Sequence, residues 1–137
     1  MRGKRVYFDA MVFIYLVEGF ESLEKPLREI RDSLLHAEAA VTTSELALCE
    51  TLVIPFRRGE TALVASYRQF IEDSGAFEVR QATRETWVRA SLLRARMGLK
   101  TPDALHVATA IEAGCEIFVT NDKTLRTPTG MRIERIF

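Results

Sequence analysis

The sequence predicts an α/β sandwich built on a parallel sheet. Short runs of β-forming residues alternate with longer helical segments, and this alternation is typical of parallel strands joined by helices. The length of 137 residues fits one domain spanning residues 1–137, and a chain of this length can bury an adequate core. Hydrophobic residues make up 47% and charged residues 28%, as in folded rather than disordered proteins.

The first third of the chain is predicted to alternate strand and helix twice. A buried β-forming run stops at Asp9, and the apolar segment after it ends at Gly19, a common helix terminator. The next segment repeats leucine and isoleucine at helical spacing and precedes a short β-prone run. The expected elements are a strand at residues 5–8, helices at 11–18 and 22–38, and a strand at 39–42.

The middle third is predicted to be mainly helical. A helix capped by Thr43-Ser44 is expected to be kinked or interrupted at Pro55 and to end at residues 57–59. A second helix over 60–73 is followed by a strand at 77–79.

In the last third, a long helix runs from a cap at Thr83 to Gly98. Thr101-Pro102-Asp103 then combine a cap, a proline in the first turn and an acid near the positive end of the helix dipole. The remaining expected elements are a helix from residue 101 to Gly114, a strand at 116–120 and a strand at 132–136.

The charge balance excludes one class of function. Lysine and arginine total 19, aspartate and glutamate total 19, and the net charge is +0, which argues against a binder driven by bulk positive charge. Two cysteines are too few for a disulfide scaffold or a cysteine-based zinc site. Since no apolar run approaches 18 residues, no membrane span is expected, and we expect a cytoplasmic protein.

The neutral total conceals an uneven distribution. Residues 1–56 carry 6 basic and 9 acidic side chains, residues 57–100 carry 9 and 5, and residues 101–137 carry 4 and 5. The basic middle segment is either an ordinary solvated surface or, at positions such as Arg57 and Arg94, a path for phosphates.

Four acids are candidates for a catalytic centre. Asp9 ends the first strand, Asp122 follows the 117–119 run, Asp103 opens the preceding helix, and Glu50 lies about two turns into its own helix. Ligands collect outside the carboxyl ends of parallel strands. Carboxylates that converge there repel one another unless a cation binds them, and oxygen ligands favour Mg²⁺ or Mn²⁺ over zinc.

Each of these acids also has a purely structural interpretation. Asp9 could cap the next helix, Asp103 could interact with the helix dipole, and Asp122 could form a turn. An isolated Glu50 would be an ordinary helix glutamate. Its neighbour Glu45 competes with it, although Glu45 also fits a capping box that begins at Thr42.

Four blocks of sequence resemble the signatures of PIN domains, most closely those of VapC-type toxins of prokaryotic toxin–antitoxin pairs. The blocks are VYFDAMVFIY, TTSELALCE, TPDALHVATA and IFVTNDK, and the resemblance covers nearly the whole chain. It implies a three-layer α/β/α sandwich with the sheet order 3-2-1-4-5, and an endoribonuclease that depends on Mg²⁺ or Mn²⁺. It assigns catalysis and metal binding to Asp9, Glu50, Asp103 and Asp122.

Residues close to the acids in the sequence add further candidates and one departure from the family pattern. Thr120 and Asn121 are similar to the polar pair beside the fourth acid, and Thr120 either bonds a carboxylate or phosphate or caps the strand end. His106, three residues after Asp103, is either a partner of the acids or a buried histidine satisfied by backbone or threonine. Met11 stands where family members often carry Asn or Ser, so an orienting hydrogen bond is either missing or supplied elsewhere.

The partners implied by the resemblance are an RNA substrate, a cognate antitoxin protein and a second copy of the chain in a homodimer. Single-stranded RNA loops are the expected substrates because their bases can be splayed out. Two alternatives stay open: a stand-alone RNA-processing nuclease, and a catalytically weak PIN-like module that binds RNA or protein. A haloacid-dehalogenase-like phosphatase is disfavoured because Met11 replaces the second acid of its Asp-x-Asp motif.

Overall fold

The computed structural model describes residues 1–136, and five strands within this range form one sheet of order β3-β2-β1-β4-β5. Every neighbouring pair of strands is parallel. The parallel sheet and its order are therefore as predicted. The strands are β1 (Arg5–Phe8), β2 (Ala40–Ser44), β3 (Phe77–Arg80), β4 (Ile117–Thr120) and β5 (Arg132–Arg135).

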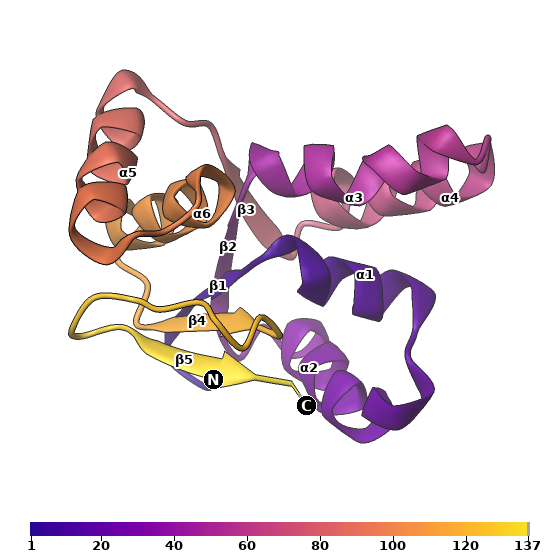
Figure 1. Ribbon diagram of the computed structural model, residues 1–137. Helices are drawn as coiled ribbons and strands as arrows, with labels where there is room; N and C mark the ends of the chain where they lie inside the picture. Colours follow the sequence, from indigo (N-terminus) through magenta and orange to yellow (C-terminus); the bar gives the residue numbers. More distant parts are fainter. Residues whose placement is uncertain (137) are drawn as a thin grey trace.

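Helices cover both faces of this sheet. In Figure 1, α5 and α6 lie on one side, while α1, α2 and the α3–α4 pair lie on the other. This arrangement gives the three layers that the resemblance implied. The helices are α1 (Ala10–Glu18), α2 (Glu24–Leu35), α3 (Glu45–Arg57), α4 (Thr61–Arg68), α5 (Arg84–Met97) and α6 (Thr101–Glu112).

Successive residues of β1 supply the two cores in turn, because side chains of a strand alternate between the faces of its sheet. Val6 and Phe8 belong to the core cluster that contains residues of α1 and α2. Tyr7 belongs to the cluster formed with α5 and α6, where its ring stacks on Phe118 with centroids 4.9 Å apart. The first strand therefore anchors both layers of helices.

Several element boundaries differ from those predicted. The helix expected over residues 22–38 is a short 3₁₀ turn followed by α2, which ends at Leu35, and Ala37 adopts a positive φ of 48°. β2 extends to Ser44 because it pairs with β3 along its length. Pro55 lies inside α3 and does not end it, because the helix continues to Arg57. The helix expected over 60–73 is α4 followed by a π-helical turn at Gln69–Asp73.

The predicted helix cap of α3 is confirmed, and two other predicted caps are wrong. Ser44 caps α3, as predicted for Thr43-Ser44, by accepting a hydrogen bond from the Leu46 amide at 3.1 Å. Thr42 is instead buried in β2, so it forms no capping box with Glu45. At α6 the cap position is Lys100, whose side chain makes no capping bond, and Thr101 is already helical.

Within residues 1–136, the structure has no helix that combines the length and the apolar character needed to cross a membrane.

Candidate active site

The first two acids meet at the edge formed by the carboxyl ends of β1 and β4. These strands are neighbours, with Phe8 opposite Val119. Asp9 follows β1 directly, and its amide donates to the Val119 carbonyl at 3.2 Å. Asp122 lies two residues beyond β4. The parallel pairing therefore brings together residues more than 100 positions apart in the sequence, as the strand-end argument predicted.

Asp9 is held on both of its carboxylate oxygens. Oδ1 accepts from the Met11 amide at 3.1 Å, which makes Asp9 the cap of α1, and Oδ2 accepts from the Thr120 hydroxyl. Burial raises the pKa of Asp9 to about 6, against a smaller opposing effect of the Thr120 hydroxyl. Thr120 thus supplies the orienting bond that the exposed Met11 side chain lacks. Asp9 therefore caps α1 and also lies in the candidate site.

Thr120 also connects Asp9 to Asp122. Its Oγ1 accepts from the Asp122 amide at 3.1 Å. Oδ1 of Asp122 accepts from both the amide and the hydroxyl of Thr124 at 2.8 Å each. These bonds, led by the one from the Thr124 amide, hold the pKa of Asp122 below its usual value. Asp122 is therefore a turn former, as its structural interpretation predicted, and also a reliably ionised carboxylate beside Asp9.

Asp103 lies in the first turn of α6 and is partly buried. Burial raises its pKa, and the negative charges of Asp122 and Glu50 raise it further. His106 and, more weakly, the Lys100 ammonium lower the pKa of Asp103, and Lys100 also lowers the pKa of Asp122. The acids of three separate segments therefore share one electrostatic environment, with one lysine beside them.

Glu50 enters this environment from α3 and is paired with α6. Its Oε1 lies 2.5 Å from Nε2 of His106, and the His106 Nδ1 lies 2.5 Å from the Tyr7 hydroxyl. His106 is therefore satisfied by a carboxylate and a phenol, not by backbone or threonine as its structural interpretation proposed. Burial is the main reason that the pKa of Tyr7 is well above its usual range.

Sequence reasoning missed Tyr7 at this site. The available signal was a tyrosine in a strand whose neighbours are wholly apolar, because a buried phenol usually finds a hydrogen-bond partner. The partner itself was not visible, since His106 is 99 positions away.

Asn121 makes its contacts away from the acids. Its Nδ2 donates to the Tyr15 hydroxyl at 3.4 Å, and its Oδ1 accepts from the Ile136 amide at 3.2 Å. It therefore ties the end of β4 to α1 and to the residues after β5. The structure brings Thr120 and His106 to the acids but directs Asn121 elsewhere.

Several arginines of the basic middle segment make structural contacts. Arg94 Nε donates to the Leu99 carbonyl at 3.1 Å, which fastens the end of α5. Arg68 pairs with Glu72 at 2.7 Å and Arg80 with Glu78 at 3.1 Å, both on the surface. Of the basic residues in this segment, Lys100 is the one whose charge acts on Asp103 and Asp122.

The side chains at this edge of the sheet offer the oxygen ligands that a hard cation prefers, but their carboxylates do not form a complete coordination site. Among the described residues, no three His, Cys, Asp or Glu side chains lie in an arrangement that could hold a metal ion. Because both nitrogens of His106 are occupied, the available donors are carboxylate oxygens, which Mg²⁺ and Mn²⁺ prefer.

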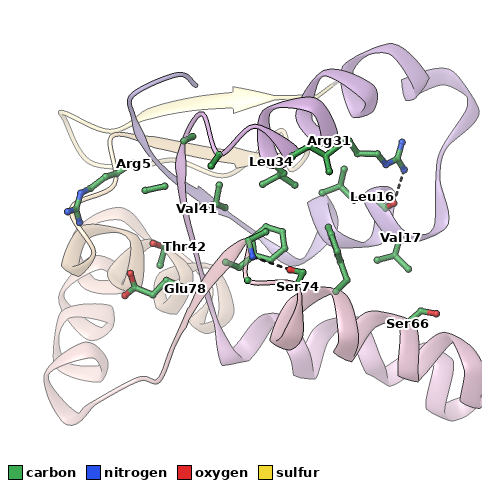
Figure 2. Close-up of a pocket in the computed structure, with 18 residues that line it drawn as sticks. Arg5, Leu16, Val17, Arg31, Leu34, Val41, Thr42, Ser66, Ser74 and Glu78 are labelled. Atoms are coloured by element: carbon green, nitrogen blue, oxygen red, sulfur yellow. Dashed lines mark hydrogen bonds between the residues drawn. The ribbon is translucent and has the colours of Figure 1, made fainter.

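A large apolar groove lies at the other end of the sheet. Its volume is about 1070 Å³, and it is lined by the first residues of β2 and β3 together with side chains from α1 and α2. Figure 2 shows Leu16, Leu34 and Val41 around it. The acids follow the carboxyl ends of the strands, so this groove is a separate surface.

Comparison with known proteins gives a family match and structural neighbours. The family model described as PIN domain matches residues 6–129. A toxin–antitoxin complex from Klebsiella pneumoniae has a similar chain with a TM-score of 0.69 and 20% identity, covering 96% of this chain and 98% of that one. A chain of VapBC2 from Rickettsia felis, crystallised with a promoter DNA fragment, is similar with a TM-score of 0.71 and 14% identity. The match covers 96% of this chain and 98% of that one. At these identities the likeness shows the fold alone. No curated protein matches the chain.

Proposed function

The chain belongs to the PIN domain family, and we propose that it is an endoribonuclease that depends on Mg²⁺ or Mn²⁺. PIN domains are generally nucleases, so a phosphodiester hydrolase is the expected activity. The observation that carries the proposal is the shared environment of Asp9, Glu50, Asp103 and Asp122 at one sheet edge. These carboxylates come from four segments that are far apart in the sequence.

In the proposed site, Asp9 and Asp103 are the principal ligands of the cation. Glu50 contributes directly or through water, and Asp122 completes the site. When bound, the cation would supply charge stabilisation for the phosphate and lower the pKa of water. Thr120 orients Asp9, and a carboxylate of the same set accepts the proton from the attacking water.

Lys100 is our proposed contact for the RNA backbone. Its ammonium lies close enough to Asp103 and Asp122 to lower both pKa values, yet no ion pair of Lys100 occurs among the described residues. A flexible cation beside an anionic cleft can hold a phosphate next to the one that is cleaved.

We further propose that the chain is the toxin of a toxin–antitoxin pair. Two structural neighbours come from such complexes. The apolar groove beside α1 and α2 is large enough for side chains of a partner segment, and the antitoxin is the occupant we propose. Homodimerisation is supported by exposed apolar side chains on two helices, namely Val53, Ile54 and Phe56 on α3 and Trp87, Val88 and Leu92 on α5.

The experiment for the nuclease is cleavage of an unstructured RNA by the purified chain. Cleavage is expected with Mg²⁺ or Mn²⁺ and is expected to disappear in excess EDTA. Asp9→Ala and Asp103→Ala should each abolish it while the circular dichroism spectrum is retained. Glu45→Ala is the matched control, because Glu45 is an exposed carboxylate on the same helix as Glu50.

Full activity in Asp9→Ala or Asp103→Ala, or undiminished activity in EDTA, would contradict the proposal. RNA binding without cleavage would favour the PIN-like binding module instead. For the toxin, expression of the chain in cells is expected to arrest growth, and co-expression of a protein encoded next to it is expected to relieve the arrest. Robust growth during expression of an active enzyme would favour the stand-alone processing nuclease.

A further inference from the structure

A chain of hydrogen bonds runs from the sheet through α6 to the acid on α3. The Tyr7 hydroxyl contacts Nδ1 of His106 at 2.5 Å, and Nε2 of His106 contacts Oε1 of Glu50 at 2.5 Å. Tyr7 is fully buried and the side chain of His106 is 5% exposed, whereas that of Glu50 is 34% exposed. These hydrogen bonds therefore begin in the buried core and end at a partly solvated carboxylate.

The chemistry of the three groups fixes the direction of these bonds. A phenol is protonated at neutral pH and can donate to Nδ1. His106 then carries its proton on Nε2, which donates to Glu50. This arrangement occupies both ring nitrogens, so His106 has none left for a cation. Oε2 of Glu50 accepts no hydrogen bond from the described residues and is left available.

We propose that Tyr7 and His106 are positioning residues that hold Glu50 so that Oε2 faces the cation site. This inference rests on the proposed function. A glutamate side chain on a partly exposed helix face has considerable rotamer freedom, and a fixed donor on one oxygen removes much of it. Tyr7 locks the ring of His106 by a second bond and by an edge contact, with ring centroids 5.6 Å apart. Glu50 is thereby oriented before any ligand arrives.

The test measures Mn²⁺ affinity by electron paramagnetic resonance in the wild-type chain and in variants. Tyr7→Phe removes only the hydroxyl, and His106→Leu removes both ring nitrogens. Loss of a partner that orients a ligand typically weakens metal binding by roughly 10- to 100-fold, and we expect a decrease in this range for both variants. His106→Gln, which keeps an N–H donor toward Glu50, is expected to recover part of the affinity.

Tyr67→Phe is the matched control. Tyr67 is also fully buried, and its hydroxyl also donates to a glutamate, Glu18, at the end of α1. This variant loses the same kind of bond, but its Mn²⁺ affinity is expected to equal that of the wild type. Urea denaturation of every variant separates a loss of affinity from a loss of fold.

A double variant decides whether Tyr7 acts through Glu50. In the Glu50→Gln background, Tyr7→Phe is expected to cause no further loss of Mn²⁺ affinity. Wild-type affinity in Tyr7→Phe, or the same fold-loss in both backgrounds, would overturn the positioning role while the proposed function stands. A wild-type chain that neither binds Mn²⁺ nor cleaves RNA would overturn both.

Discussion

Replacing Asp9 by asparagine is expected to stabilise the cation-free protein at neutral pH. Burial raises the pKa of Asp9 from 3.8 to about 6, so the folded chain binds this proton more tightly than the unfolded chain. The resulting stability is complete below about pH 4 and is lost as the pH rises through about 6. At roughly 1.4 kcal/mol per pKa unit, the loss is about 3 kcal/mol at pH 7.5. Asparagine carries no such charge and can still cap α1 through its carbonyl oxygen.

The assay is urea denaturation of the wild type and Asp9→Asn in EDTA between pH 4 and pH 7.5. Over this range, the unfolding free energy of the variant relative to the wild type should rise by about 3 kcal/mol. Addition of Mn²⁺ should then stabilise the wild type and leave the variant unchanged. A difference that does not vary with pH would show that folding does not raise the pKa of Asp9.

Asp122→Asn is expected to change the pH dependence of stability in the opposite direction. Hydrogen bonds from Thr124 lower the pKa of Asp122, so its contribution to stability is present above about pH 4 and is lost as the pH falls. This variant should therefore lose stability relative to the wild type as the pH rises from 3 to 5.

Three further substitutions test separate parts of the account. Thr120→Val removes the donor to Asp9 and should lower the unfolding free energy by about 2 kcal/mol, measured by denaturation. It should also raise the pKa of Asp9, measured by carboxyl NMR. An unchanged pKa would contradict the hydrogen bond. Lys100→Gln should weaken RNA binding and reduce the slope of log affinity against log salt by about 0.7, and an unchanged slope would exclude a phosphate contact. Ser44→Ala should cost about 1 kcal/mol by removing the cap of α3 without changing Mn²⁺ affinity, whereas an affinity loss would show that α3 shifts.

The sheet was predictable because its strands are marked by local features. β-forming runs ended by Asp9 and by Asn121-Asp122 identify strands that stop at the same edge, and parallel pairing then brings those acids together. Boundaries that depend on tertiary contacts were less predictable. β2 continues through Ser44 because β3 pairs with it, whereas Thr43 and Ser44 are locally compatible with a helix cap as well as with a strand.

The hydrogen bonds between the site residues could not be predicted from the sequence. Asp9 was weighed as either a cap or a ligand, but its two oxygens allow both roles through different partners. The link from Tyr7 through His106 to Glu50 joins positions 99 and 56 residues apart, and no periodic pattern reports such a contact. The charge count showed a basic segment, yet only the packing of α5 onto α6 distinguishes the structural Arg94 from Lys100.

The most direct test of the proposed cation site is a crystal structure of the chain grown with Mn²⁺, with anomalous scattering measured at the manganese edge. We expect an anomalous peak at the carboxyl ends of β1 and β4, ligated by carboxylate oxygens of Asp9 and Asp103. We also expect Glu50 to turn Oε2 toward that peak while His106 holds Oε1. An ion bound elsewhere, or no peak among these carboxylates at saturating Mn²⁺, would exclude the proposed cation site.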